Sequence, residues 1–124
     1  MLLAASLTEQ VIGLAVEVHR NTGPGLLEAV YEQCLCFELR RASLEFTRQA
    51  LIPTRYKGQQ VDDGFRADFV VAEQLILEIK SVATILPVHE MQLRTYLRMS
   101  GMRVGLLLNF NAPRLMDGLC RYVM

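Results

Sequence analysis

A pair of apolar segments in the middle of the chain, Phe65–Val71 and Leu75–Lys80, constrains its fold more than any other feature of the sequence. In both segments apolar residues occupy every second position, as they do on the covered face of a β-strand. These residues are Phe65, Ala67, Phe69 and Val71, and Leu75, Leu77 and Ile79. Only three residues separate the segments, which indicates an antiparallel hairpin. Pairing Val71 with Leu75 joins the two apolar sets on one face, whereas a slip by one residue would separate them.

The predicted register brings two carboxylates together on the opposite face. Asp68 falls directly opposite Glu78, and Arg66 falls opposite Lys80. Directly opposed residues have Cβ atoms about 4.5–5.5 Å apart, a separation at which like charges are destabilising. The two carboxylates must therefore bind a proton, contact cations or bind a metal ion. An oxygen-rich site of this kind suits Mg²⁺ or Mn²⁺, and Lys80 could bind a water or phosphate oxygen beside it.

The four charged residues could instead form a cross-strand salt-bridge network on a solvated face, because structural ion pairs imitate active sites. Val70 and Ile76 lie on the same predicted face. As apolar residues they indicate that the face is partly covered, where unneeded charges would be unfavourable. This observation favours the metal site slightly.

The other patterns predict a mixed α/β fold. Helices are predicted at about residues 7–20, Leu26–Arg41 and Pro87–Ser100, and further strands at Leu44–Gln49, Leu51–Lys57, Arg103–Phe110 and Leu119–Val123. Pro53 indicates an edge or irregular position, and turns are predicted at Lys57–Gln59 and Asp62–Gly64. The segment Arg103–Phe110 is almost continuously apolar, which is typical of a strand covered on both faces. A chain of 124 residues supports one core, so we expect residues 1–124 to form a single domain.

Composition argues against several classes of protein. The 13 Lys and Arg residues match 13 Asp and Glu residues, which argues against a globally basic nucleic-acid coat. Uncharged stretches are shorter than the roughly 20 apolar residues of a membrane span, so no membrane partner is expected. Residues 1–5 lack the basic start of a secretory signal. Cys34, Cys36 and Cys120 lack metal-binding spacing, and we expect reduced thiols in a cytoplasmic protein.

The motif Gly25-x-x-Glu28-x-x-Tyr31 lies at the start of the second predicted helix. Seven further segments accompany this motif along the chain: Val18-His19, Gly23-Pro24-Gly25, Tyr56-Lys57-Gly58, Arg66-Ala67-Asp68, Glu78-Ile79-Lys80, Gln92 with Tyr96, and Gly105–Phe110. In this order they resemble the GxxExxY proteins, which are placed in the PD-(D/E)XK nuclease-like (restriction-endonuclease-like) superfamily. The resemblance covers nearly the whole chain. It implies a core of order α-β-β-β-α-β around a mixed sheet, preceded here by an extra N-terminal helix.

The resemblance also implies roles for individual residues. Asp68 and Glu78 resemble the metal-binding acids of the superfamily, and Lys80 resembles the lysine that positions the attacking water. Ile79 would add its backbone carbonyl to the metal ligands. Glu28 resembles the acidic residue that the first core helix contributes, although a carboxylate is favoured in the first turn of any helix.

The third predicted helix contributes further candidates. Gln92 and Tyr96, one turn apart, resemble a pair found near the site in some branches of the superfamily, and they could equally form a face lying on the sheet. Arg94 on this helix and Arg66 in the hairpin are candidate substrate contacts, although an arginine such as Arg94 is more often solvated or ion-paired. Tyr31 is expected to pack, with its hydroxyl bonded locally.

Two functions are consistent with these residues. The first is a magnesium- or manganese-dependent nuclease that hydrolyses phosphodiester bonds in DNA or RNA with water activated by the metal. Without a dense Lys/Arg run, it would need a small substrate, a nucleic-acid end or a partner with a basic surface. The second is a catalytically weak or inactive nuclease-like binding or assembly module. The high fraction of apolar residues leaves room for a dimer interface, so this module could be a homodimer. The complete set of Asp68, Glu78 and Lys80 favours the first.

Overall fold

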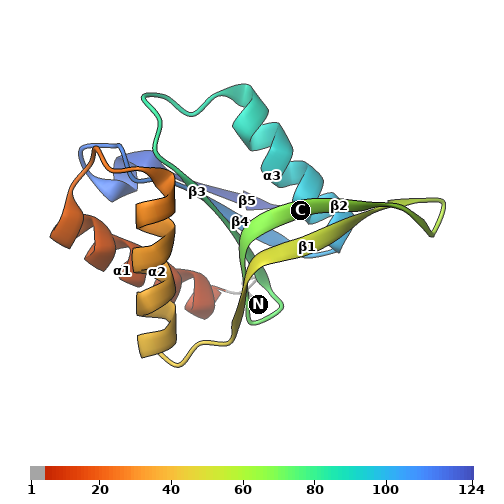
Figure 1. Cartoon of the computed structure of the whole chain (residues 1–124), viewed down its shortest axis with the longest axis horizontal. Coiled ribbons are helices and arrows are strands. Elements are labelled where there is room, and N and C mark those ends of the chain that lie inside the picture. The colour runs from red at the N-terminus through yellow and green to blue at the C-terminus, as the bar shows by residue number, and fades with distance from the viewer. Residues whose placement is uncertain (1–4) are drawn as a thin grey trace.

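The computed structural model describes residues 5–124, and these form an α/β fold with three α-helices and a five-stranded sheet (Figure 1). The helices are α1 (Ala5–Thr22), α2 (Glu28–Arg41) and α3 (Pro87–Ser100), with a 3₁₀ helix, η1 (Leu115–Gly118). The strands are β1 (Phe46–Tyr56), β2 (Gln59–Val71), β3 (Leu75–Lys80), β4 (Val104–Asn109) and β5 (Leu119–Val123). From α2 to β4 the order is the expected α-β-β-β-α-β, and α1 is the extra helix.

The sheet is mixed, with its strands in the spatial order β1-β2-β3-β4-β5. The pairs β1–β2, β2–β3 and β4–β5 are antiparallel. The pair β3–β4 is parallel, because α3 carries the chain back along the sheet between these strands. Parallel pairing at the centre requires cover on both faces.

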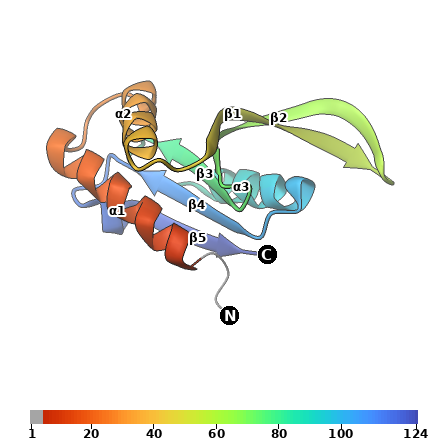
Figure 2. The ribbon, with the colours of Figure 1, turned by 90° about the horizontal axis from the view of Figure 1, so that it is seen from below.

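Helices supply that cover on both faces (Figure 2). Buried side chains of α1 and α2 pack with one set of strand residues, and buried side chains of α3 pack with another. All six residues of β4 are buried, so the strand predicted from the apolar segment Arg103–Phe110 is confirmed as covered on both faces. Its residues alternate between the two cores, with Leu106 and Leu108 under α1 and α2 and Leu107 under α3.

The β1–β2 hairpin is longer and more continuous than the sequence predicts. The two strands predicted at Leu44–Gln49 and Leu51–Lys57 are one strand, β1, and the turn predicted at Asp62–Gly64 lies within β2. The pairing register of β1 with β2 shifts between Ile52 and Arg55. The residues there form an irregularity within the two strands, and the chain does not turn back at this point. Gly64 has a φ of 87°, and a Cβ there would lie 1.8 Å from a backbone oxygen of β1. Glycine is therefore required at this close approach, and β1 is an edge strand, as Pro53 predicts.

The alternation of side chains predicted for β2 breaks near its middle. Phe69 belongs to the core under α1 and α2, whereas Ala67 belongs to the core under α3. The prediction of one apolar face for the whole segment was therefore wrong. The change occurs opposite Gln49, which lies between two paired positions of β1 and has a φ of 53°. A left-handed residue in a strand redirects the neighbouring side chains, as in a β-bulge.

No helix within residues 5–124 is long and apolar enough to cross a membrane. Cys36 is buried, and Cys34 and Cys120 are half-buried. The expectation about a secretory signal rests on residues 1–5. Residues 1–4 lie outside the part of the chain that the structure describes.

Candidate active site

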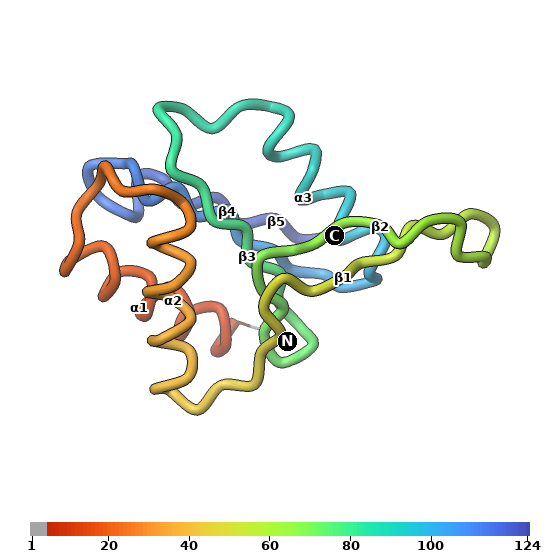
Figure 3. The backbone as a smooth tube through the Cα atoms, in the orientation of Figure 1, coloured from red at the N-terminus to blue at the C-terminus, as the bar shows by residue number. Residues whose placement is uncertain are grey.

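The predicted pairing of β2 with β3 is confirmed, and it ends at the two carboxylates. The paired residues are Phe69 with Leu77, Val70 with Ile76, and Val71 with Leu75. Beyond them the strands diverge, because β2 continues into the β1–β2 hairpin while β3 runs toward the start of α2 (Figure 3). Asp68 and Glu78 are the next residues and lie where the strands separate. The pairing does not extend to Arg66 and Lys80, which the sequence predicts to be opposed.

Each of the two acids accepts a hydrogen bond from the backbone of the opposite strand. The backbone N–H of Asp68 donates to Oε2 of Glu78 over 2.8 Å, and the backbone N–H of Ile79 donates to Oδ2 of Asp68 over 2.7 Å. Each carboxylate thus satisfies a backbone donor that a continued ladder would have paired with a carbonyl. The backbone of each strand thereby orients the carboxylate of the opposite strand.

Burial changes the proton affinity of both acids. Glu78 is only 5% exposed, and its burial, followed by the charge of Asp68, raises its pKa to about 8. Burial also raises the pKa of half-buried Asp68, against the opposing hydrogen bond from Ile79. At neutral pH the pair therefore holds a proton, which relieves the repulsion expected from the sequence. A divalent ion would favour the fully ionised pair.

Tyr96 and Lys80 lie beside the acids. Tyr96 comes from the inner face of α3, with its ring 5.1 Å from the ring of Phe65. Its pKa is raised to about 12 by burial and by the negative charges of Glu78 and Asp68. The positive charge of half-buried Lys80 lowers the pKa of both acids, against the effect of burial.

The apolar neighbours Val70 and Ile76 are 5% and 0% exposed and pack with the α3 core. The prediction that this face is covered is confirmed.

Glu28 is brought to the same end of the sheet by the turn before α2. The Tyr31 hydroxyl donates to the Gly23 carbonyl over 2.6 Å and accepts the backbone N–H of Leu26, and its ring stacks on Phe110. Local bonding of this hydroxyl confirms the packing role expected for Tyr31. The exposed Glu28 carboxylate accepts the backbone N–H of Ser81, directly after β3, over 3.4 Å.

Three further predicted site residues are exposed: Gln92, Arg94 and Arg66. Gln92 is exposed on α3. The guanidinium of Arg94 lies 5.1 Å from the ring centre of Tyr122 on β5, which is separated from β2 by two strands. Arg66 is exposed, and its guanidinium donates to the backbone carbonyl of Gln49 over 3.4 Å.

Sequence reasoning missed a network of three residues that reaches the site through Gln49. Gln49 donates its side-chain amide to Oδ1 of Asp68 over 3.2 Å and to Oε1 of Glu32 over 2.6 Å. Arg48 forms a salt bridge of 2.7 Å with Glu32. One signal was available, because Glu28 and Glu32 are four residues apart and share a helix face.

The donor atoms fit a hard divalent ion with an incomplete protein ligand set. Among residues 5–124, no group of three or more His, Cys, Asp or Glu side chains is arranged to hold a metal. Asp68 and Glu78 would offer carboxylate oxygens to such an ion, and the backbone carbonyl of Ile79 is the further ligand expected from the sequence. Mg²⁺ commonly binds through one or two carboxylates and takes its remaining ligands from water and substrate phosphate.

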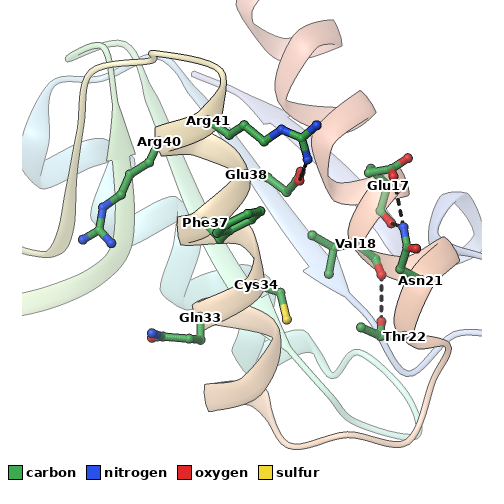
Figure 4. A pocket seen from close by; sticks show the side chains of 10 residues that line it. All are labelled: Glu17, Val18, Asn21, Thr22, Gln33, Cys34, Phe37, Glu38, Arg40 and Arg41. Atoms are coloured by element: carbon green, nitrogen blue, oxygen red, sulfur yellow. Dashed lines mark hydrogen bonds and ion pairs between the residues drawn. The ribbon is translucent and has the colours of Figure 1, made fainter.

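A hollow lies elsewhere, between α1 and α2 (Figure 4). This groove of about 520 Å³ is lined by Val18, Cys34 and Phe37, with charged residues of both helices around them. Phe37 is 61% exposed. The carboxylate pair is not part of this groove, so the groove is a separate surface.

Comparison with known proteins identifies the family. The model of the PD-(D/E)XK nuclease superfamily matches residues 5–122. No curated protein and no solved structure gives a significant match. The narrower resemblance to the GxxExxY proteins stays a prediction. The matched range contains both acids, Lys80 and the whole α-β-β-β-α-β core, and the chain therefore belongs to the PD-(D/E)XK nuclease superfamily.

Proposed function

We propose that this chain is a magnesium- or manganese-dependent nuclease that hydrolyses phosphodiester bonds in DNA or RNA. The observation that carries the proposal is the pair Asp68 and Glu78, each of which accepts a backbone hydrogen bond from the opposite strand where β2 and β3 diverge. Two adjacent acids in a buried position are unfavourable for folding unless they hold a proton or bind a cation, and among the described residues neither acid has a salt-bridge partner. Membership in a superfamily of nucleases, which generally depend on divalent metals, supports the same conclusion.

In this proposal Asp68, Glu78 and the Ile79 carbonyl hold the ion, with Glu28 as a further acid at the end of β3. A bound divalent ion would neutralise phosphate charge and lower the pKa of a water. Lys80 orients that water or stabilises negative charge on the phosphate. Tyr96 closes the site toward α3, since it is buried beside the acids.

Substrate contacts are proposed on the rim of the site. Arg66 is exposed beside Gln49 and is the nearer candidate. Gln92 and Arg94 would take part only with a substrate that extends over α3. The equal numbers of basic and acidic residues favour a small substrate or a nucleic-acid end over a long duplex footprint.

Calorimetric titration with Mg²⁺ and Mn²⁺ tests the metal site. The parent protein is expected to bind the ion at pH 7 and to release about one proton, because the carboxyl of Glu78, with a pKa of about 8, must ionise. Titrations in two buffers of different ionisation enthalpy measure the number of protons released. At pH 9 the release should be close to zero.

The variants Asp68→Asn and Glu78→Gln are expected to lose this binding. Asp63→Asn, at an exposed position on the same strand as Asp68, should retain it. Equal binding by all four proteins would refute the assignment of the site to Asp68 and Glu78. The absence of binding in the parent would favour the assembly module, unless nucleic acid completes the ligand set, which a titration with a non-hydrolysable phosphorothioate oligonucleotide present would reveal.

The assembly alternative is favoured by one observation, the exposed Phe37 in the α1–α2 groove. We propose this groove as the contact in a homodimer. Phe37→Glu would place a charge in the apolar contact and is expected to convert the dimer to monomers in sedimentation equilibrium. The matched variant Val88→Glu, at an exposed apolar position on α3, should leave the mass unchanged. A monomeric parent protein would exclude the dimer.

A further inference from the structure

Gln49 is held in an unusual backbone conformation next to the carboxylate pair. Its φ is 53°, in a backbone region that residues other than glycine and asparagine rarely adopt. The residue is exposed and lies within β1, in the part of the strand before Ala50. Backbone strain of this kind clusters at functional sites, where the surrounding structure maintains it.

The side chain of Gln49 links α2 to Asp68. Its single amide nitrogen donates to Oε1 of Glu32 over 2.6 Å and to Oδ1 of Asp68 over 3.2 Å. An amide nitrogen carries two hydrogens, so both bonds can form together. The linkage therefore crosses from a helix through the edge strand to the carboxylate on β2.

Glu32 is itself fixed in place. Arg48 donates from Nε and from Nη2 to Oε2 of Glu32, over 2.8 and 2.7 Å. Oε1 of Glu32 remains for Gln49. The rigid pair of Arg48 and Glu32 thus determines where the amide of Gln49 can lie.

We propose that Gln49 is a positioning residue that fixes the Asp68 carboxylate for metal binding, with Glu32 as its anchor; this inference rests on the proposed function. Oδ2 of Asp68 accepts the Ile79 N–H, and Oδ1 accepts the Gln49 amide, so both oxygens are oriented. Each oxygen has a second lone pair available to a metal ion. Removing the hydrogen-bond partner of a metal ligand typically lowers the affinity for the metal by about 10–100-fold.

Mn²⁺ binding by Gln49→Gly tests this role without adding strain. Glycine adopts positive φ readily, so the thermal midpoint is expected to stay equal to that of the parent or to rise. The dissociation constant for Mn²⁺, measured by calorimetry, is expected to increase about tenfold or more. Glu32→Ala should weaken binding in the same direction, and the double variant should add little, because both changes interrupt one chain of hydrogen bonds.

The matched control for Gln49→Gly is Gln60→Gly, at an exposed position of the β1–β2 hairpin, and the control for Glu32→Ala is Glu38→Gln, also on α2. Both should bind Mn²⁺ like the parent. If Asp68→Asn loses Mn²⁺ binding while Gln49→Gly keeps the affinity of the parent, the positioning role is refuted and the proposed function stands. If Asp68→Asn also binds like the parent, or the parent binds no Mn²⁺ even with the phosphorothioate oligonucleotide present, both are refuted. A lower thermal midpoint of Gln49→Gly with unchanged affinity would show a purely structural role.

Discussion

Replacing Asp68 by Asn is expected to lower kcat/KM for phosphodiester cleavage by about 10³-fold or more, and Glu78→Gln is expected to have an effect of similar size. Removing one group that stabilises transition-state charge typically costs about 10²–10³-fold, and each of these acids is proposed to hold the ion that supplies this stabilisation. The amide of each variant keeps an oxygen that can accept the same backbone hydrogen bond. The fold is therefore expected to persist, and the loss would report on the chemistry.

Initial rates on single-stranded DNA, duplex DNA and RNA, each with Mg²⁺ and with Mn²⁺, provide the measurement. Asp63→Asn on β2 and Glu73→Gln in the turn before β3 are the matched controls, because both positions are exposed and away from the pair. Both should cleave like the parent protein. Activity of Asp68→Asn equal to that of Asp63→Asn would mean that cleavage does not depend on this site.

Glu78→Gln is also expected to stabilise the metal-free protein at high pH. The ordinary pKa of this carboxyl is 4.5, and in the folded chain it is about 8. The folded state therefore holds the proton more tightly, which stabilises it fully below pH 4.5, and this stabilisation is lost as the pH rises through 8. The difference corresponds to on the order of 4 kcal/mol in the free energy of unfolding, and glutamine at this position does not titrate.

Urea unfolding in the presence of a chelator, at pH 4.5 and at pH 8.5, measures this effect. Relative to the parent, Glu78→Gln should gain stability between the two pH values, whereas Glu9→Gln on the exposed surface of α1 should not. Addition of Mg²⁺ at pH 8.5 should stabilise the parent and leave Glu78→Gln unchanged. A difference between parent and variant that is the same at both pH values would contradict the burial of an ionised acid.

Much of this fold was predictable because it depends on local periodicity. The register of β2 and β3 follows from their alternation and the short turn, and it places Asp68 near Glu78. The continuous apolar pattern of β4 correctly predicted burial on both faces. The division of β1 into two strands was wrong, because an edge strand can absorb Pro53 and an irregular register without reversing.

The surroundings of the acids were less predictable. Gln49 joins Glu32 to Asp68 only because folding brings α2 next to β1, and the sequence separations of 17 and 19 residues follow no periodic pattern. The sequence also could not show that the Arg94 guanidinium lies over the ring of Tyr122, whereas Tyr96, two residues later on α3, is buried beside the acids.

The amino-acid sequence by itself determined the hairpin, the order of the core elements and the proximity of two carboxylates, because short-range alternation and turn length specify them. Only the tertiary structure decided that the strands separate at Asp68, that Glu78 is buried enough to hold a proton near neutral pH, and that Gln49 reaches the pair. These properties depend on how the helices cover the two faces of the sheet. Desolvation and long-range hydrogen bonds arise from that packing and have no local signature in the chain.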